Sequence, residues 1–149
     1  MNSQAKKKTA DELAKILATT YCLYLKTQNF HWNVTGPHFH DLHSLFQSQY
    51  EALSEAVDEI AERIRALGHP APGSFSAFSK ISSIKDSSGN PKAKEMVKVL
   101  LSDHETAAEC AKEVLDAAQA AGDDVTVDMM VERIQEHDKT AWMLKSILA

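Results

Sequence analysis

The residue types best suited to bind a metal ion gather between Asn29 and Gly68. Two imidazoles, His31 and His43, precede two carboxylates, Asp58 and Glu62, within that stretch. Fe(II) and similar divalent ions accept imidazole and carboxylate ligands together, so this set predicts an iron-type site. Taken singly, each residue has a plainer interpretation, because a histidine near a helix end is usually a cap or a satisfied polar residue, and an acid on an exposed helix face is usually solvated. The hypothesis therefore depends on the four residues as a spaced set.

The second part of this stretch has the pattern of one long helix, from about Phe39 to Leu67. Its apolar residues recur at alternating steps of four and three, which is typical of a seam packed against neighbouring helices. Asp58 and Glu62 lie four residues apart beside that seam and can converge on one ion. The seam consists of Phe46, Tyr50, Leu53, Val57, Ile60, Ile64 and Leu67.

One helix cannot bring all four ligands to the same ion. His43 and Asp58 are fifteen residues apart in the sequence, which at ~1.5 Å per residue separates them by roughly 22 Å along the helix. A twofold axis crossing the helix between them would place His43 of one subunit against Asp58 and Glu62 of an antiparallel copy. His31, at the end of the preceding helix, can approach His43 across the Gly36-Pro37 turn. The spacing therefore predicts two identical sites per dimer, each shared between two chains.

Four long helical patterns account for most of the chain, and capping residues mark their ends. Between the second and the third lies a Pro/Gly/Ser-rich connection from Pro70 to Asn90, in which Ser74–Ile84 is expected to hold a short helix. A connection of this length implies a crossover, so the pattern predicts an all-α, ferritin-like four-helix bundle with a short extra helix between the second and third helices. The first helix is expected from a Thr9–Glu12 capping box to about Val34, the third from an Asn90 cap and Pro91 to Gly122, and the fourth from near Thr126 almost to the C-terminus.

Composition favours one compact domain. The 149 residues are 44% hydrophobic and include five Gly and four Pro, which is enough apolar content for a single core. The net charge of -5 argues against a generally basic nucleic-acid surface. The apolar runs fall far short of the ~20 residues that a membrane span needs, and no basic-then-apolar leader precedes the first helix, so we expect a cytoplasmic protein.

The chain begins with a polar segment that contains three consecutive lysines, Lys6, Lys7 and Lys8. We expect a flexible basic N-terminal arm at residues 1–8, followed by one bundle domain at residues 9–149. Di-iron bundles usually hold metal inside their own core with Glu-x-x-His pairs, and this sequence contains none. An ordinary centre inside one bundle is therefore not expected, and His104 and His137 are interpreted as structural residues.

Several of these segments together are similar to the Dps family, the mini-ferritins also called DNA-binding proteins from starved cells. The likeness covers essentially the whole chain and is strongest at residues 30–37, 42–43, 58–63 and 137–144. It implies a hollow homo-dodecamer with iron oxidation at twofold interfaces and a ferric mineral inside. It also implies that His31 and His43 of one subunit and Asp58 and Glu62 of its mate bind the iron, with at most two irons per site.

The resemblance implies a ferroxidase and iron-storage function, with hydrogen peroxide as the oxidant, that protects against oxidative damage under stress. One position departs from the family pattern, because Gln47 stands where an acid commonly follows the second histidine. A neutral amide adds no negative charge, so we expect the second iron to bind more weakly. Asp123 and Asp128 match family acids that line a threefold pore and draw Fe(II) inward, although the helix dipole alone also favours acids at that place.

Two alternative functions stay open. A nucleoid-associated, DNA-compacting protein with weak or no ferroxidase activity would bridge DNA through Lys6, Lys7 and Lys8 on each of twelve arms. The acidic net charge and the shortness of the arm argue against DNA binding. A purely structural bundle, which has lost metal binding because Gln47 replaces the acid, would not accelerate iron oxidation at all.

Overall fold

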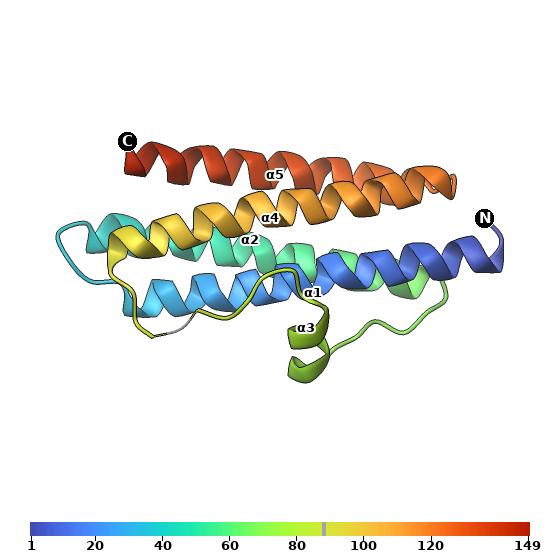
Figure 1. The fold of residues 1–149 in the computed structure, drawn as a ribbon, viewed down its shortest axis with the longest axis horizontal. Coiled ribbons are helices and arrows are strands. Elements are labelled where there is room, and N and C mark those ends of the chain that lie inside the picture. Colours follow the sequence, from blue (N-terminus) through green and yellow to red (C-terminus); the bar gives the residue numbers. More distant parts are fainter. Residues whose placement is uncertain (88) are drawn as a thin grey trace.

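The computed structural model describes residues 1–87 and 89–149. Within these residues the chain forms five helices and no strand, and four of the helices are long and lie side by side (Figure 1). The expected all-α bundle with a short helix between the second and third long helices is confirmed. The helices are α1 (Ser3–Asn33), α2 (Phe39–Ala66), α3 (Phe75–Ile81), α4 (Ala93–Ala120) and α5 (Asp124–Leu148).

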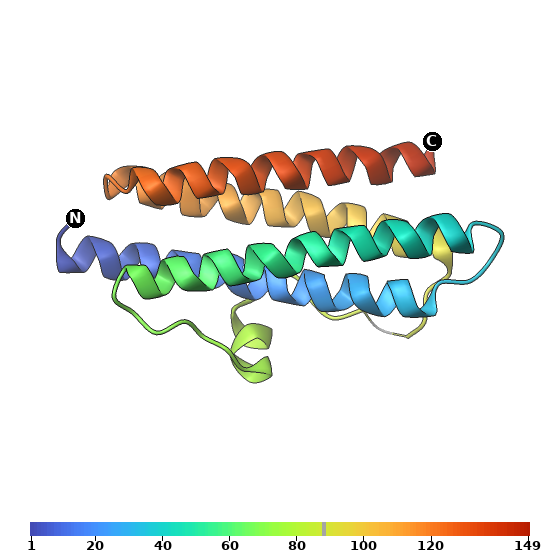
Figure 2. The same cartoon turned by 180° about the vertical axis from the view of Figure 1, so that it is seen from behind.

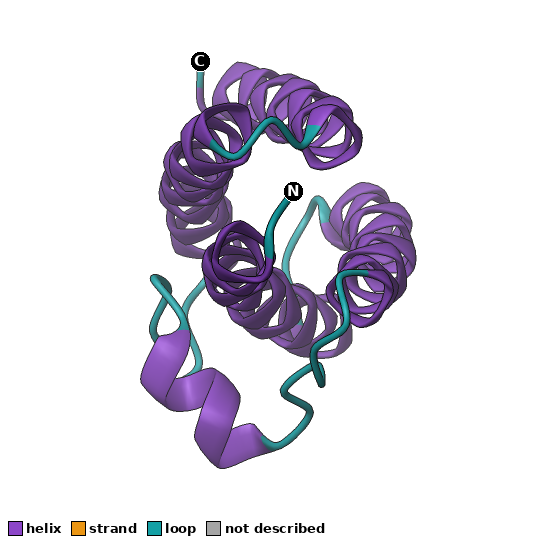
Figure 3. Cartoon of the chain, turned by 90° about the vertical axis from the view of Figure 1, so that its right-hand side faces the viewer, coloured by secondary structure: helices purple, strands orange, loops and turns teal. Residues whose placement is uncertain are grey.

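The long helices form two antiparallel hairpins, α1 with α2 and α4 with α5, which Figure 3 shows along the bundle axis. The connection from α2 to α4 returns along the outside of the bundle, and its short helix α3 packs against α1 (Figure 2). The two hairpins meet mainly where α1 packs on α4, whereas α2 and α5 contact each other little. None of the helices in the described residues is both long and apolar enough to cross a membrane.

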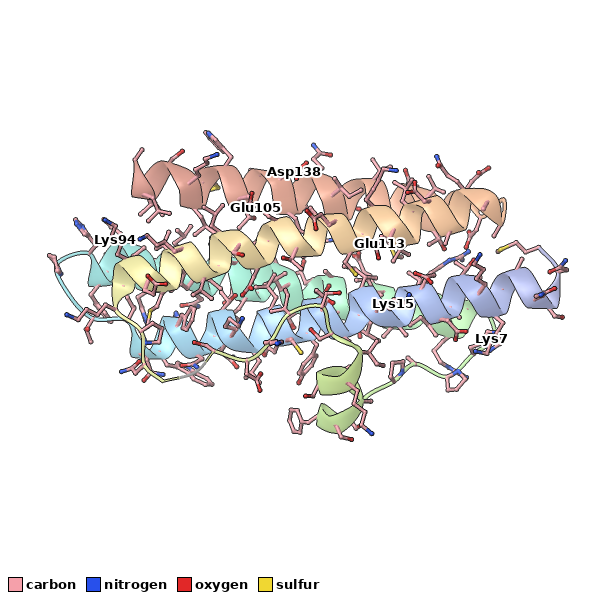
Figure 4. The ribbon with its side chains drawn as sticks, viewed as in Figure 1. Lys7, Lys15, Lys94, Glu105, Glu113 and Asp138 are labelled. Atoms are coloured by element: carbon pink, nitrogen blue, oxygen red, sulfur yellow. The ribbon has the colours of Figure 1, made fainter. Side chains whose placement is uncertain are left out.

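The core runs along the whole bundle and contains the predicted seam of α2. Phe46, Ile60 and Ile64 are 0–1% exposed, and Tyr50 and Val57 are half-buried. Because seam residues recur on one face, burying them also fixes which residues of α2 face outward. Charged side chains occupy the outer faces, and those labelled in Figure 4 are all exposed, namely Lys7, Lys15, Lys94, Glu105, Glu113 and Asp138.

Two expected helix starts are wrong. The first helix begins at Ser3 rather than Thr9, because the Asn2 side chain caps it by accepting from the Ala5 N–H at 2.8 Å. The Thr9 hydroxyl instead donates to the Ala5 carbonyl inside the helix. Residues 3–8 are therefore helical in the structure, where a flexible arm is expected from the sequence. The pair between Lys7 and Asp11, one turn apart, supports this first turn.

The third long helix begins at Ala93, with Lys92 as its N-cap, rather than at Asn90 and Pro91. Lys92 has extended dihedral angles and its side chain makes no capping hydrogen bond. Pro91 thus belongs to the connection, where its fixed φ suits an extended backbone as well as a first helical turn. The start of α5 at Asp124 likewise differs by two residues from the expected Thr126, whereas α2 and α4 end next to Gly68 and Gly122 as the pattern predicts.

An ion pair ties the end of α2 to the start of α5. Arg63 donates from Nη2 to Asp123 Oδ1 at 2.8 Å and from Nε to the Thr126 hydroxyl oxygen at 3.0 Å. Asp123 is 3% exposed and also caps α5 by accepting from the Thr126 N–H. Burial alone would raise the pKa of Asp123, but the hydrogen bonds from Thr126 and the charge of Arg63 outweigh it and hold that pKa below its ordinary value.

We predict that Arg63→Met destabilises the chain by about 3 kcal/mol, because it leaves a buried carboxylate without its counter-charge. The double variant Arg63→Met/Asp123→Asn should recover most of this loss, since a neutral asparagine still caps the helix. Urea denaturation at pH 7 measures both values. Because the pKa of Asp123 is lowered on folding, its contribution is present above the ordinary carboxyl pKa of 3.8 and is lost as the pH falls below it.

The matched control is Lys112→Met, which breaks the pair between Lys112 and Asp116. Both of these side chains are more than half exposed, so the expected change is at most about 0.5 kcal/mol. Equal losses in the single Arg63 variant and the double variant would show that the ion pair is not the source of the stability.

Candidate metal centre

The turn between α1 and α2 brings His31 and His43 into direct contact. Their rings stack with centroids 3.8 Å apart and planes inclined by 13°. The contact is reciprocal: His31 Nδ1 lies 2.7 Å from the His43 carbonyl oxygen, and His43 Nδ1 lies 2.7 Å from the His31 carbonyl oxygen. The approach expected across the Gly36-Pro37 turn is therefore present in a single chain.

These two hydrogen bonds determine where each imidazole carries its proton. A carbonyl oxygen can only accept, so both Nδ1 atoms must be donors. In a neutral imidazole the proton on Nδ1 leaves a lone pair on Nε2, which is the atom that can bind a metal ion. Neither Nε2 atom has a hydrogen-bond partner among the described residues. His31 and His43 thus present two oriented Nε2 lone pairs that could hold a metal ion.

Aromatic rings hold this histidine pair from both sides. The Phe39 ring stacks on His43 with a centroid distance of 5.0 Å, and Tyr50 presents its edge to His31 at 5.2 Å. His31 is 7% exposed and His43 is half-buried. Packing on both sides leaves the two imidazoles little freedom to rotate, so their hydrogen bonds and their orientation are fixed together.

The two carboxylates of the predicted site lie toward the other end of α2. Asp58 and Glu62 are exposed, lie one turn apart, and form no ion pair or hydrogen bond with any described residue. In the described part of one chain, no group of three or more His, Cys, Asp and Glu residues is close enough to hold a metal ion. In a single chain the candidate ligands therefore lie in two separate groups, one of imidazoles and one of carboxylates.

Gln47 lies one turn after His43 and is exposed. Its amide nitrogen donates to Glu51 Oε1 at 2.9 Å, so its oxygen is the end of the amide that stays available to a ligand. Glu51 is a residue that the reasoning from sequence missed. The spacing in the sequence could have identified it, because His43, Gln47 and Glu51 follow one another at steps of four and share a helix face. A carboxylate thus lies one turn beyond the amide that replaces the family's acid.

The other sequence-derived candidates fall into different environments. Asp128 is exposed on α5, whereas Asp123 is buried and engaged by Arg63 and Thr126. Trp32, next to His31 in the chain, is 61% exposed. The three lysines at the start of α1, Lys6, Lys7 and Lys8, are all exposed.

Residues 10–149 match the family model of the ferritin-like domain. The chain is 34% identical over 142 residues to the DNA protection during starvation protein 2 of Bacillus anthracis, covering 95% of this chain and 97% of that relative.

Two crystal structures have closely similar folds. The Dps protein from Bacillus brevis has a TM-score of 0.96 and 33% identity, covering 100% of both chains. The DPS protein from Vibrio cholerae O1, described as a member of a superfamily of ferritin-like diiron-carboxylate proteins, has a TM-score of 0.96 and 30% identity, covering 100% of this chain and 94% of that one. The family model, the relatives and the fold agree that this chain belongs to the Dps family of ferritin-like proteins, the mini-ferritins.

Proposed function

We propose that this chain is a ferroxidase and iron-storage protein that oxidises Fe(II) with hydrogen peroxide at sites shared between subunits of a dodecameric shell. The observation that carries the proposal is the division of one ligand set into two prepared halves. His31 and His43 present two Nε2 lone pairs at one end of α2, and Asp58 and Glu62 present two unpaired carboxylates at the other. An antiparallel second copy completes both sites at once.

The ligand set suits the chemistry of iron oxidation. Imidazoles and carboxylates together bind Fe(II), and the two negative charges of Asp58 and Glu62 favour the more highly charged Fe(III) product. Two Fe(II) ions, one hydrogen peroxide and two protons give two Fe(III) ions and two water molecules. Delivering both electrons to one peroxide avoids releasing a hydroxyl radical. The side chains bind and orient the iron substrate, and none of them acts as a nucleophile.

The acids at the start of α5 have different parts in this proposal. Asp128 is exposed and is the residue that we assign to a threefold pore, where its charge would concentrate Fe(II). Asp123 is already neutralised by Arg63, so we assign it a positioning role that holds the first turn of α5. Asp123 then affects the pore indirectly, because it holds the first turn of the helix that carries Asp128.

Mixing two inactive variants tests whether the site is shared. His43→Ala and Asp58→Ala should each slow Fe(II) oxidation strongly, because each damages every site. After dissociation and reassembly of an equal mixture, half of the dimers are mixed and each of these has one intact site of two. Stopped-flow measurement of Fe(II) oxidation by peroxide should therefore recover about a quarter of the wild-type rate.

The matched control mixes His43→Ala with His31→Ala. Both changes damage the imidazole half, so no reassembled dimer regains an intact site and no recovery is expected. Equal recovery in the two mixtures, or none in either, would contradict a site shared between chains.

Gln47 should make the affinities of the two metal positions in one site unequal. We expect anaerobic titration with Zn(II) to show one tight ion per site and a second, weaker one, because the amide supplies no charge. Gln47→Glu should tighten the second ion by about tenfold through one added negative charge. Ser48→Glu adds the same charge at the neighbouring exposed position and should leave the second ion nearly unchanged. Two equally tight ions in the wild type would rule this account out.

DNA binding is the second candidate function, favoured by the name of the Bacillus anthracis relative and by the exposed lysines of α1. We expect a gel shift at about 50 mM salt that disappears near 200 mM, because such contacts release counterions. Lys6→Ala/Lys8→Ala should abolish the shift. Lys94→Ala/Lys112→Ala, which removes two exposed lysines elsewhere, should preserve it. A shift that survives the first pair of changes would show that α1 does not contact the DNA.

A further inference from the structure

A second histidine pair lies inside the bundle and takes no part in the proposed iron chemistry. His104 of α4 and His137 of α5 are 2% and 1% exposed, and Gln49 of α2, 8% exposed, lies with them on the wall of a cavity of about 30 Å³. The three residues come from both hairpins of the bundle, whose helices α2 and α5 contact each other little.

The two imidazoles bind each other through their Nδ1 atoms, which are 3.0 Å apart. One Nδ1 must donate and the other must accept. In the neutral pair, the donating ring then has a lone pair on Nε2 and the accepting ring has an N–H there. The pair therefore presents one acceptor and one donor to its surroundings, and it cannot carry a proton on both Nδ1 atoms without breaking the contact.

The outward-facing polar atoms of this cluster have no partner in the described residues. They are both Nε2 atoms and the oxygen and nitrogen of the Gln49 amide. Leaving a buried donor or acceptor unsatisfied costs about 1–3 kcal/mol each, so a folded protein rarely keeps four together. The amide of Gln49 offers one acceptor and a donor group, which matches the donor and acceptor of the histidine pair. The atoms are thus complementary but not in contact.

The cavity between them fits one kind of ligand. A buried water needs about 10–15 Å³ of probe-occupied space and two to four polar partners, and both are present here. A cavity of about 30 Å³ is too small for an organic molecule. A metal ion suits the site poorly, because the Nδ1 lone pair and proton are used within the pair, which leaves the two rings a single Nε2 lone pair between them.

We propose that Gln49, His104 and His137 form a built site for one water molecule that joins the two hairpins of the bundle, and that protonation of the histidine pair opens this link. The water bridges the Gln49 amide to the pair. A first proton adds to the free Nε2 lone pair and turns that acceptor into a donor, so the pair then presents two donors and a buried positive charge, and its match to the donor and acceptor of the Gln49 amide is lost. The site is independent of iron and of the proposed function.

The surroundings keep the pair neutral near pH 7. Burial, followed by the charge of Arg133, lowers the pKa of His104 to about 3, and burial, His104 and Arg133 lower the pKa of His137. Arg133 and Glu136 of α5 are the charged residues at the cavity wall, where α2 adds Gln49, Ala52 and Leu53, and α4 adds His104. Free histidine titrates near 6.5, so the unfolded chain takes up protons first. The contribution of the neutral pair to the free energy of unfolding is therefore fully present above pH 6.5 and is lost as the pH falls below that value.

High-resolution crystal structures of the full-length protein at pH 7.5 test the bound ligand. We expect one ordered water within hydrogen-bond distance of Gln49 and of a histidine Nε2, and we expect the Gln49→Leu variant to lose it. An empty cavity in the wild type, or a metal ion identified there by anomalous scattering, would overturn the proposal.

Calorimetry of the full-length protein tests the proton link. Between pH 7 and pH 5 the wild-type Tm should fall by at least about 4 °C more than that of His104→Leu/His137→Leu, in which neither histidine of this pair is left to be protonated. His69→Gln removes a histidine of the connection that follows α2, outside the cluster, and should keep the wild-type pH dependence. Equal pH dependence in the wild type and the double variant would overturn the link.

Hydrogen exchange of the wild type gives an answer even when the double variant does not fold. After correction for the intrinsic effect of pH, the segments of α2 and α5 around Gln49 and His137 should lose protection below pH 6.5. The segment of α1 around Leu13 and Ile16, which are both fully buried, should keep its protection. Uniform loss along the chain, or no loss, would overturn the proposal.

Discussion

The rigidity of α2 is the constraint on which the rest of the structure depends. A helix rises ~1.5 Å per residue and cannot fold back, so His43 and Asp58 stay roughly 22 Å apart however the chain packs. The buried seam of α2 fixes the rotation of the helix as well, which decides that Asp58 and Glu62 face outward without partners. A site that uses both ends must therefore be completed by a second chain. The fixed length of α2 thus requires an interface between two chains if both ends of the helix serve one site.

The two halves of the proposed site are prepared by different means. The imidazole half is organised within one chain, because reciprocal hydrogen bonds and flanking aromatic rings set the position and the protonation of His31 and His43. The carboxylate half is left open, with both acids exposed. Preorganising the neutral ligands does not repel an approaching cation or require charges to be buried in the single chain. The charged ligands lose their hydration only when the metal and the second half are present.

The sequence pattern was sufficient for the order of the helices, for the seam of α2 and for the contact across the Gly36-Pro37 turn, because these depend on residues that are neighbours in the chain. The starts of α1 and α4 differ from the expected ones, since Asn2 caps α1 ahead of Thr9, and α4 starts after Lys92 without a side-chain cap that a sequence pattern could reveal. The contact of His104 with His137 was not predictable from spacing. Those residues are on different helices, and only the packing register of α4 against α5 brings their Nδ1 atoms to 3.0 Å.

The two histidine pairs show that the partner of Nδ1 decides what an imidazole can do. In His31 and His43, each Nδ1 donates to a backbone carbonyl, so both Nε2 atoms keep lone pairs and both rings can be ligands. In His104 and His137, the Nδ1 atoms bind each other, so only one Nε2 keeps a lone pair while the other carries the proton. The first arrangement suits a cation and the second suits a water molecule. Residue type is the same in both pairs, and the difference comes from a backbone turn in one case and from helix packing in the other.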